Sequence, residues 1–283
     1  MKKEMILGLL LSVMAIGASA QENGGIFSFE VGSAEVYMMV EVERPGNTGI
    51  FIGANDALLK QTIPAEGFPN SINTFLVRTK DMTILIDTGF GQAVFEHLKK
   101  LGVTPEEIDV VLITHLHGDH FGGLQKDGKA LFPKATVYLA ESELEYWTKT
   151  NVNESAAAAL APYSSRLKTF TPNNLCGTLT ELIPGIIPIA AYGHTVGHTA
   201  YLIDDNGEKL LVWGDLMHVE LVQFPNPDIS VTYDTNPKAA AVVRWQILDY
   251  AAKNKIPIAG MHLVYPAMGM VEAAGSGYKL IKF

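Results

Sequence analysis

The sequence holds a single cysteine, Cys176, and few basic residues for its length. One thiol cannot form an internal disulfide, so packing or bound metal must supply any stability the chain needs outside the cytoplasm. Lys and Arg total 21 against 30 Asp and Glu, which gives a formal net charge of −9. Because an acidic chain gains no counterion-release affinity for a phosphate backbone, we expect no nucleic-acid partner.

The sequence also lacks a hydrophobic run long enough to form a transmembrane helix. The apolar run at residues 5–16 has twelve residues, whereas a membrane span needs about 20. Lys2 and Lys3 precede the run and Ala18-Ser19-Ala20 follows it, an order typical of a cleavable signal peptide. We expect cleavage after Ala20, a periplasmic or secreted location and no stable membrane insertion. A buried N-terminal helix is the alternative.

Strand and helix patterns alternate through the remaining chain, residues 21–283. Apolar, β-branched runs predict buried strands, while helical spacing and capping residues predict helices. In the first half these patterns predict a hairpin over 72–87 with its turn at Lys80-Asp81, and further strands over 109–114 and 135–140. They also predict three helices: one over 91–101 ended by Gly102, a short one from Thr104-Pro105, and one through Trp147 that starts with a capping box of Ser142 and Glu145.

The second half repeats this plan of strands and covering helices. The patterns predict strands over 186–191, 200–204 and 210–213, a hairpin turn at Asn206-Gly207, a helix opened by Asn236-Pro237, and a last buried strand over 256–261. Because both halves contribute strands and helices, we predict one α/β domain over 21–283, a four-layer αββα sandwich.

Four potential metal ligands crowd the segment that follows the predicted strand 109–114. His115 and His117 project to the same side of an extended segment, and a turn at Gly118 lets Asp119 and His120 point back toward them. Such crowding is costly unless the side chains share a cation. Nitrogen and oxygen ligands at a strand end favour a zinc-type site, and a solvated histidine-rich loop is the alternative.

Three further segments place histidine or aspartate at the ends of predicted strands. The segment Gly-His-Thr-Val-Gly-His-Thr (residues 193–199) offers His194 and His198, and either could bind metal. Asp215 follows the strand 210–213, and His262 follows the strand 256–261. Taken alone, a Gly-Asp pair is more often a turn and a lone histidine is more often structural. The combination is what indicates a metal site.

Together these motifs resemble the dinuclear hydrolases of the metallo-β-lactamase superfamily. The resemblance rests on His-x-His-x-Asp-His (residues 115–120), Gly-His-Thr-x-Gly-His-Thr (residues 193–199), Gly214-Asp215 and the late His262. It covers about residues 71–283, is less specific over 24–70, and looks closest to the branch of methyl parathion hydrolase and related lactonases. It implies the αββα fold of that superfamily.

The resemblance implies a ligand set for two divalent metal ions. Carried onto matching positions, it assigns His115, His117 and His194 to one metal, Asp119, His120 and His262 to the other, and Asp215 as the bridge. In the family the first histidine of the Gly-His-Thr motif is the ligand. The resemblance therefore implies that His198, like Asp87, lies next to the ligands and does not itself bind metal. Asp87 resembles a buried aspartate that orients a ligand histidine, and a plain turn residue is its alternative. Zinc suits these ligands best, although manganese, iron and cobalt also fit.

The family's chemistry implies hydrolysis by a hydroxide that bridges the two metals. The expected substrate is a small lactone or related ester, with phosphotriesters as a further class. Asp119 and His218 are the candidate catalytic side chains. His218 could donate a hydrogen bond to an oxyanion or protonate a leaving alkoxide, and a surface or packing histidine is its alternative. Trp147, Met217 and Phe224 are candidates for an apolar pocket wall or ordinary core.

Two other functions stay open at this point. A β-lactam hydrolase would use the same fold, but the classical β-lactamases of the family generally lack the full ligand set present here. A non-catalytic, metal-stabilised binding protein would need a metal site closed to solvent. A homodimer is left open as an assembly. A substrate panel with metal content measured on the same sample would separate these functions.

Overall fold

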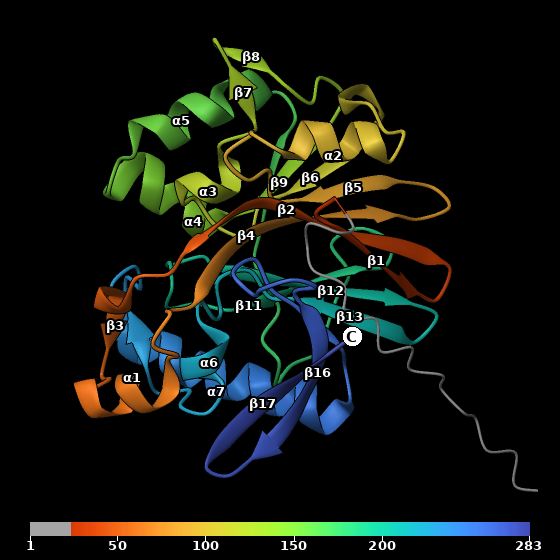
Figure 1. Cartoon of the computed structure of the whole chain (residues 1–283). Coiled ribbons are helices and arrows are strands. Elements are labelled where there is room, and N and C mark those ends of the chain that lie inside the picture. Colours follow the sequence, from red (N-terminus) through yellow and green to blue (C-terminus); the bar gives the residue numbers. More distant parts are fainter. Residues whose placement is uncertain (1–23) are drawn as a thin grey trace, which may run out of the picture.

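The computed structural model describes residues 24–283, so the predicted signal segment lies outside the described residues. The chain forms two large sheets, each with its strands in a defined spatial order (Figure 1). The first sheet contains, in that order, β1 (Ile26–Val31), β2 (Ala34–Pro45), β4 (Pro69–Arg78), β5 (Thr83–Ile86), β6 (Val110–Leu112), β9 (Thr136–Ala140) and β10 (Leu167–Phe170). The second contains β11 (Ile186–Ala190), β12 (Thr199–Asp205), β13 (Glu208–Val212), β15 (Ile258–Ala259), β16 (Met268–Ala274) and β17 (Gly277–Lys282).

The main core lies between the two sheets. Phe75 and Ile86 from the first sheet and the paired residues Tyr201 and Val212 from the second belong to one cluster of buried side chains. A second core lies on the outer face of the first sheet, beneath α2 (Val94–Lys100), α3 (Gly118–Phe121), α4 (Glu141–Glu145) and α5 (Glu154–Leu160). The helix α7 (Pro237–Asn254) packs on the second sheet through Ile247, Leu248 and Ala251. The predicted αββα sandwich is confirmed.

Local sequence signals account for most of these elements. The hairpin of β4 and β5 forms where predicted, with Phe75 opposite Ile86. Asn206 and Gly207 both have positive φ angles, 57° and 92°, as a tight hairpin turn between β12 and β13 requires. Asn236 caps α7 by accepting a hydrogen bond from the Ala239 N–H. Thr104 and Glu107 form the capping box of a short 3-10 helix (Pro105–Glu107).

Two expectations for these elements were wrong. The helix α4 begins at Glu141 without a side-chain cap and continues into a π-helical turn, Tyr146–Thr150, so Ser142 and Glu145 form no capping box. The helix starts directly at the end of β9, which leaves no turn for Ser142 to cap. The strand near 256–261 is not the last, because β16 and β17 follow it as an antiparallel hairpin. Neither that hairpin nor β1 and β2 was anticipated.

The chain between β2 and β4 forms a small lobe beside the sandwich (Figure 1). It contains a 3-10 helix (Thr48–Ile50), β3 (Phe51–Ile52) and α1 (Asp56–Thr62). The strand β3 pairs with β14 (Ser230–Val231), and Ile50, Phe68 and Val222 pack in a third cluster with α6 (Glu220–Gln223). The remaining short elements are β7 (Gln125–Lys126), β8 (Lys129–Ala130) and a 3-10 helix (Ala161–Tyr163). Within residues 24–283, no helix is both long and apolar enough to span a bilayer.

Candidate metal centre

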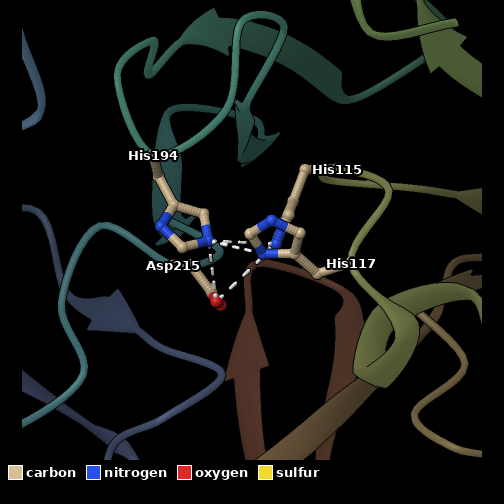
Figure 2. A group of neighbouring side chains, drawn as sticks. All are labelled: His115, His117, His194 and Asp215. Carbon is tan, nitrogen blue, oxygen red and sulfur yellow. Dashed lines mark hydrogen bonds and ion pairs between the residues drawn. The ribbon is translucent and has the colours of Figure 1, made fainter. Parts of the chain in front are cut away.

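The side chains predicted as ligands converge where loops from both sheets meet. His115 and His117 follow β6, His194 lies between β11 and β12, and Asp215 follows β13. Figure 2 shows these four pointing toward one another. The Nε2 atom of His194 lies 3.2 Å from Nε2 of His115 and 3.0 Å from Nδ1 of His117. Asp215 Oδ2 lies 3.3 Å from His194 Nε2 and 3.7 Å from His115 Nε2. One cation could contact all four residues.

A second group forms on the other side of Asp215. It consists of Asp119 and His120, carried by α3, and His262, which follows β15. The Nε2 atom of His120 lies 3.2 Å from Asp215 Oδ1, and that of His262 lies 3.0 Å from Asp215 Oδ2. Asp119 lies 3.7 Å from His120 and 3.6 Å from His262. Asp215 therefore stands between two groups, as the resemblance implied for a bridge.

The chemistry of these donors fits divalent metal ions. Three imidazole nitrogens face one another at hydrogen-bonding distance, and His120 Nε2 and Asp215 Oδ1 are buried without a hydrogen-bond partner. Burial and the positive charge of His194 lower the pKa of His117 to about 3, which gives the neutral imidazole that binds metal. Such a convergence of lone pairs is costly unless a cation satisfies it.

The carboxylates of the site also stabilise positive charge on the histidines beside them. Burial opposes the charged form of His120, but Asp215, Asp119 and Asp87 raise its pKa well above the usual value. Burial likewise opposes the charged form of His194, yet hydrogen bonds to Asp215 and Asp234 raise its pKa to about 9. Divalent cations would supply the positive charge that these carboxylates favour.

Asp87 is buried against the metal centre and has a positive φ angle of 57°. Its Oδ2 accepts hydrogen bonds from His120 Nδ1 at 2.7 Å and from the Thr114 hydroxyl at 2.7 Å. Its Oδ1 accepts a hydrogen bond from the Thr114 N–H at 2.8 Å. Asp87 thus fixes both the end of β6 and the ring of His120, with the ring's Nε2 aimed at Asp215.

His198 does not join the cluster of facing nitrogens. Its Nδ1 donates to the Ala191 carbonyl at 2.8 Å, and its Nε2 accepts from the Asp215 N–H at 2.9 Å. Burial, reinforced by the charge of His194, lowers the pKa of His198 to about 3, so the ring stays neutral and can accept that bond. The structure therefore places His194 in the cluster that could hold a metal ion, whereas the hydrogen bond from the Asp215 N–H places His198 against the backbone of Asp215.

Two buried carboxylates of the site were missed from the sequence. Asp234 accepts a hydrogen bond from His194 Nδ1 at 2.8 Å. Glu143 ties the two histidine loops together, since it accepts from the Leu116 N–H at 2.9 Å and from the Gly197 N–H at 2.8 Å. Both residues lie outside the histidine motifs, and no spacing or composition signal marks them. Only the packing of α4 and of the segment before α7 against the site reveals them.

His218 is buried beside the metal centre rather than on the surface. Its Nε2 lies 3.2 Å from Asp215 Oδ2, and its ring stacks on that of His262 with centroids 4.8 Å apart. Its N–H donates to the side chain of Gln223 at 2.8 Å, which fixes the backbone. Both ring nitrogens are buried without a hydrogen-bond partner. Burial lowers the pKa of His218 to about 4, so the imidazole is neutral at pH 7.

A cavity of about 620 Å³ opens directly onto the metal centre. Side chains of both metal groups line its inner end, and its outer wall comes from the lobe and the loops around Phe90 and Tyr233. The residues on its inner end are His117, Asp119, Asp215, His218 and His262. A volume of this size suits a small-molecule substrate.

The expected apolar wall was wrong. Met217 and Phe224 are buried in the core between the sheets, and neither lines the cavity. Trp147 does not line it either. Its Nε1 donates a hydrogen bond to the buried Glu143 at 2.6 Å, which holds the indole ring beside that carboxylate. Its ring instead lies edge-on to His117, with centroids 5.7 Å apart. The sequence did not show that the lobe, rather than the segments around the motifs, supplies the wall.

Comparison with known proteins identifies a family. Residues 67–249 match the family model described as the metallo-beta-lactamase superfamily. Among solved structures, the hydrolase AbOPH in the beta lactamase superfamily is 31% identical with a TM-score of 0.82, and the alignment covers 92% of this chain and 97% of that one. AidC, a dizinc quorum-quenching lactonase in complex with the product N-hexanoyl-L-homoserine, is 25% identical with a TM-score of 0.80, again over 92% and 97%.

Curated relatives match over shorter stretches. The anti-Pycsar protein Apyc1 of Paenibacillus sp. is 41% identical over 28% of this chain and 33% of its own length. The hydroxyacylglutathione hydrolase of Shewanella loihica is 30% identical over 47% of this chain and 44% of its own length. The chain thus spans less than half the length of these two proteins.

Proposed function

The chain belongs to the metallo-beta-lactamase superfamily, and we propose that within it this protein is a dinuclear metal-dependent hydrolase that opens lactones or related esters. One observation carries the proposal: six histidine and aspartate side chains converge as two groups around Asp215, at the inner end of a cavity large enough for a small substrate. A site that only stabilised the fold would need no such cavity.

We assign the ligands as the two groups of side chains. His115, His117 and His194 hold one metal, Asp119, His120 and His262 hold the other, and Asp215 contacts both. Zinc suits the imidazole and carboxylate ligands best, and manganese, iron or cobalt also fit. When bound, two such ions lower the pKa of water toward 7 and polarise the carbonyl oxygen of a substrate.

The residues of this chain then supply positioning and proton transfer. Asp87 and Asp234 fix the rings of His120 and His194, so their Nε2 atoms stay aimed at Asp215. Asp119 faces the cavity with its side chain 21% exposed, where its carboxylate can accept a proton from water. His218 lines the same cavity, and as a neutral imidazole it can donate a hydrogen bond to the carbonyl oxygen or to the leaving oxygen as negative charge develops there.

The substrate class rests on similarity together with the cavity. The lactonase AidC aligns with this chain over nearly its whole length, and the hydroxyacylglutathione hydrolase of Shewanella loihica matches over part of it. Both names describe hydrolases, so lactones and related esters are the first substrates to test. Phosphotriesters form a further class, because the same arrangement of two cations can clamp a phosphoryl oxygen.

A panel of lactones, aryl esters, phosphotriesters and β-lactams tests this proposal, with metal content measured on the same sample. We expect lactones or esters to give the highest kcat/KM and the protein to hold about two metal equivalents. A penicillin or cephalosporin as the best substrate would contradict the substrate class. One equivalent that added metal cannot raise would contradict the dinuclear site.

We also propose that the protein is exported and cleaved after Ala20. The support is the order of Lys2 and Lys3, the apolar run and the Ala18-Ser19-Ala20 segment. Mass spectrometry of protein recovered from the cell envelope and medium tests it, and an intact Met1 on that protein would contradict it.

A further inference from the structure

The outer end of the cavity carries an arginine. Arg44 lies near the end of β2, directly opposite Asn70 of β4 in the antiparallel register. Residues that are paired in this way project to the same face of the sheet with Cβ atoms about 4.5–5.5 Å apart. Both residues line the cavity that contains His117, Asp119 and His262. A guanidinium and an amide therefore stand side by side in the same cavity as the metal centre.

Within the described part of the chain, no side chain forms an ion pair with Arg44. Across residues 24–283, no carboxylate lies within 4.0 Å of Arg44, and no hydrogen bond of its side chain is present. Glu43 is its neighbour on β2 and projects to the opposite face of the sheet. Glu43 and Glu66 both line the adjoining hollow that Arg44 also borders, but within residues 24–283 neither carboxylate forms an ion pair with Arg44. The arginine keeps its full capacity to bind an anion.

The rest of the outer wall is uncharged. Ile50, Phe68, Phe90 and Tyr233 offer apolar surface, and Asn47 offers an amide. Among the cavity-lining residues in the described part of the chain, Arg44 is the only lysine or arginine. The cavity thus brings together a candidate metal centre, several apolar side chains and, among its lining residues, a single guanidinium.

We propose that Arg44, with Asn70, binds a carboxylate on the substrate while the substrate's ester or lactone group lies at the metal centre. The inference rests on the proposed function and narrows it from esters in general to esters that carry an anionic group. The planar guanidinium can donate two parallel hydrogen bonds to a carboxylate, and the Asn70 amide can donate another. One carboxylate matches the single charge of Arg44, whereas a phosphate monoester would bring up to two charges.

A matched pair of esters tests the inference. Mono-4-nitrophenyl glutarate and methyl 4-nitrophenyl glutarate share the leaving group and acyl chain and differ in one negative charge. We expect the protein to prefer the acid by about tenfold or more in kcat/KM. Arg44→Gln should raise KM for the acid by about tenfold and leave the methyl ester within twofold, while Arg44→Lys should keep part of the preference. The control is Arg78→Gln, because Arg78 is exposed at the other end of β4 and pairs with Glu35.

Equilibrium binding of glutarate by calorimetry gives a readout that does not depend on turnover. The wild-type protein should bind glutarate about tenfold more tightly than Arg44→Gln, and Arg78→Gln should match the wild type. If neither ester is hydrolysed but glutarate binding depends on Arg44, the proposed hydrolase is wrong and the anion site stands. If both esters are hydrolysed equally well and glutarate binds both proteins alike, the anion site is overturned and the hydrolase stands.

Discussion

The two ends of the cavity differ in how firmly the chain holds their side chains. At the inner end the second ring nitrogens of His120, His194 and His262 are bound by Asp87, Asp234 and the Ser71 carbonyl at 2.7–2.8 Å. At the outer end Arg44 has no ion-pair or hydrogen-bond partner among residues 24–283, and Phe90 and Tyr233 are 40% and 52% exposed. Buried hydrogen bonds fix side-chain geometry, whereas an exposed side chain without such bonds can change rotamer. The cavity therefore has a rigid end, at the candidate metal centre, and an adaptable end, at Arg44, Phe90 and Tyr233.

Removal of the bridging carboxylate should have the largest effect at the rigid end. Asp215→Ala takes away the side chain that lies between both ligand groups, and it leaves the Nε2 atoms of His120 and His262 without their closest carboxylate. We expect the metal content to fall from about two equivalents to one or fewer and kcat/KM to fall by about 10³-fold or more. Elemental analysis and ester turnover measure this. Lys149→Ala, on an exposed i,i+4 ion pair, is the control, and full activity of Asp215→Ala with two metals would refute the bridge.

Loss of a carboxylate that orients a ligand should have the next largest effect. Asp234→Asn keeps the shape of the side chain but removes the charge that faces His194 Nδ1. We expect a 10- to 100-fold loss of metal affinity, with a smaller loss of kcat once metal is in excess. Titration of apoprotein with zinc measures the affinity. The control is Asp205→Asn, since Asp205 binds Ser33 in an exposed turn; equal affinities for both variants would show that Asp234 serves the fold alone.

Substitution of His218 tests whether this residue, which lines the cavity beside the candidate metal centre, takes part in catalysis. His218→Ala should keep both metals but lower kcat by about 10²-fold on an alkyl lactone, because the charge that develops on its leaving oxygen needs the hydrogen bond that the His218 ring donates. An activated aryl ester should lose much less, because its leaving group is stable as an anion. Parallel kcat measurements on the two substrates decide the question. Equal small losses on both, with unchanged metal content, would make His218 a packing residue.

Trimming the adaptable end should have the smallest effect. Phe90 and Tyr233 are exposed, so Phe90→Ala and Tyr233→Ala should change the free energy of unfolding by about 0.5 kcal/mol or less. We expect KM to change by about two- to tenfold, because each ring offers apolar contact to a substrate. Thermal unfolding and initial rates measure both quantities. The comparison would fail if either variant lost metal or unfolded at a much lower temperature than wild type.

Short-range signals explain why much of the fold could be predicted. The hairpin of β4 and β5, the Asn206-Gly207 turn and the Asn236 cap each depend on residues that are neighbours in sequence. The strands β16 and β17 and the strands β1 and β2 were missed although each pair is a hairpin of neighbouring strands. β1 forms an edge of the first sheet and β17 an edge of the second. Only one residue of β1 and two residues of β17 are buried, so neither strand carries the apolar run that predicts a buried strand.

The residues of the candidate metal centre likewise fall into two sets, those that the sequence predicted and those that only the structure revealed. The segment 115–120 and the residues His194, Asp215 and His262 could be singled out from the sequence because donor atoms at strand ends carry a chemical signature. That signature predicted which residues form the site, and the structure brings them together in two groups around Asp215. Only the tertiary structure decided that Asp234 and Glu143 support them, and that Arg44 rather than Met217 or Phe224 faces the cavity. A supporting carboxylate or a wall residue is defined by what packs against it, and packing between distant segments leaves no pattern in the local sequence.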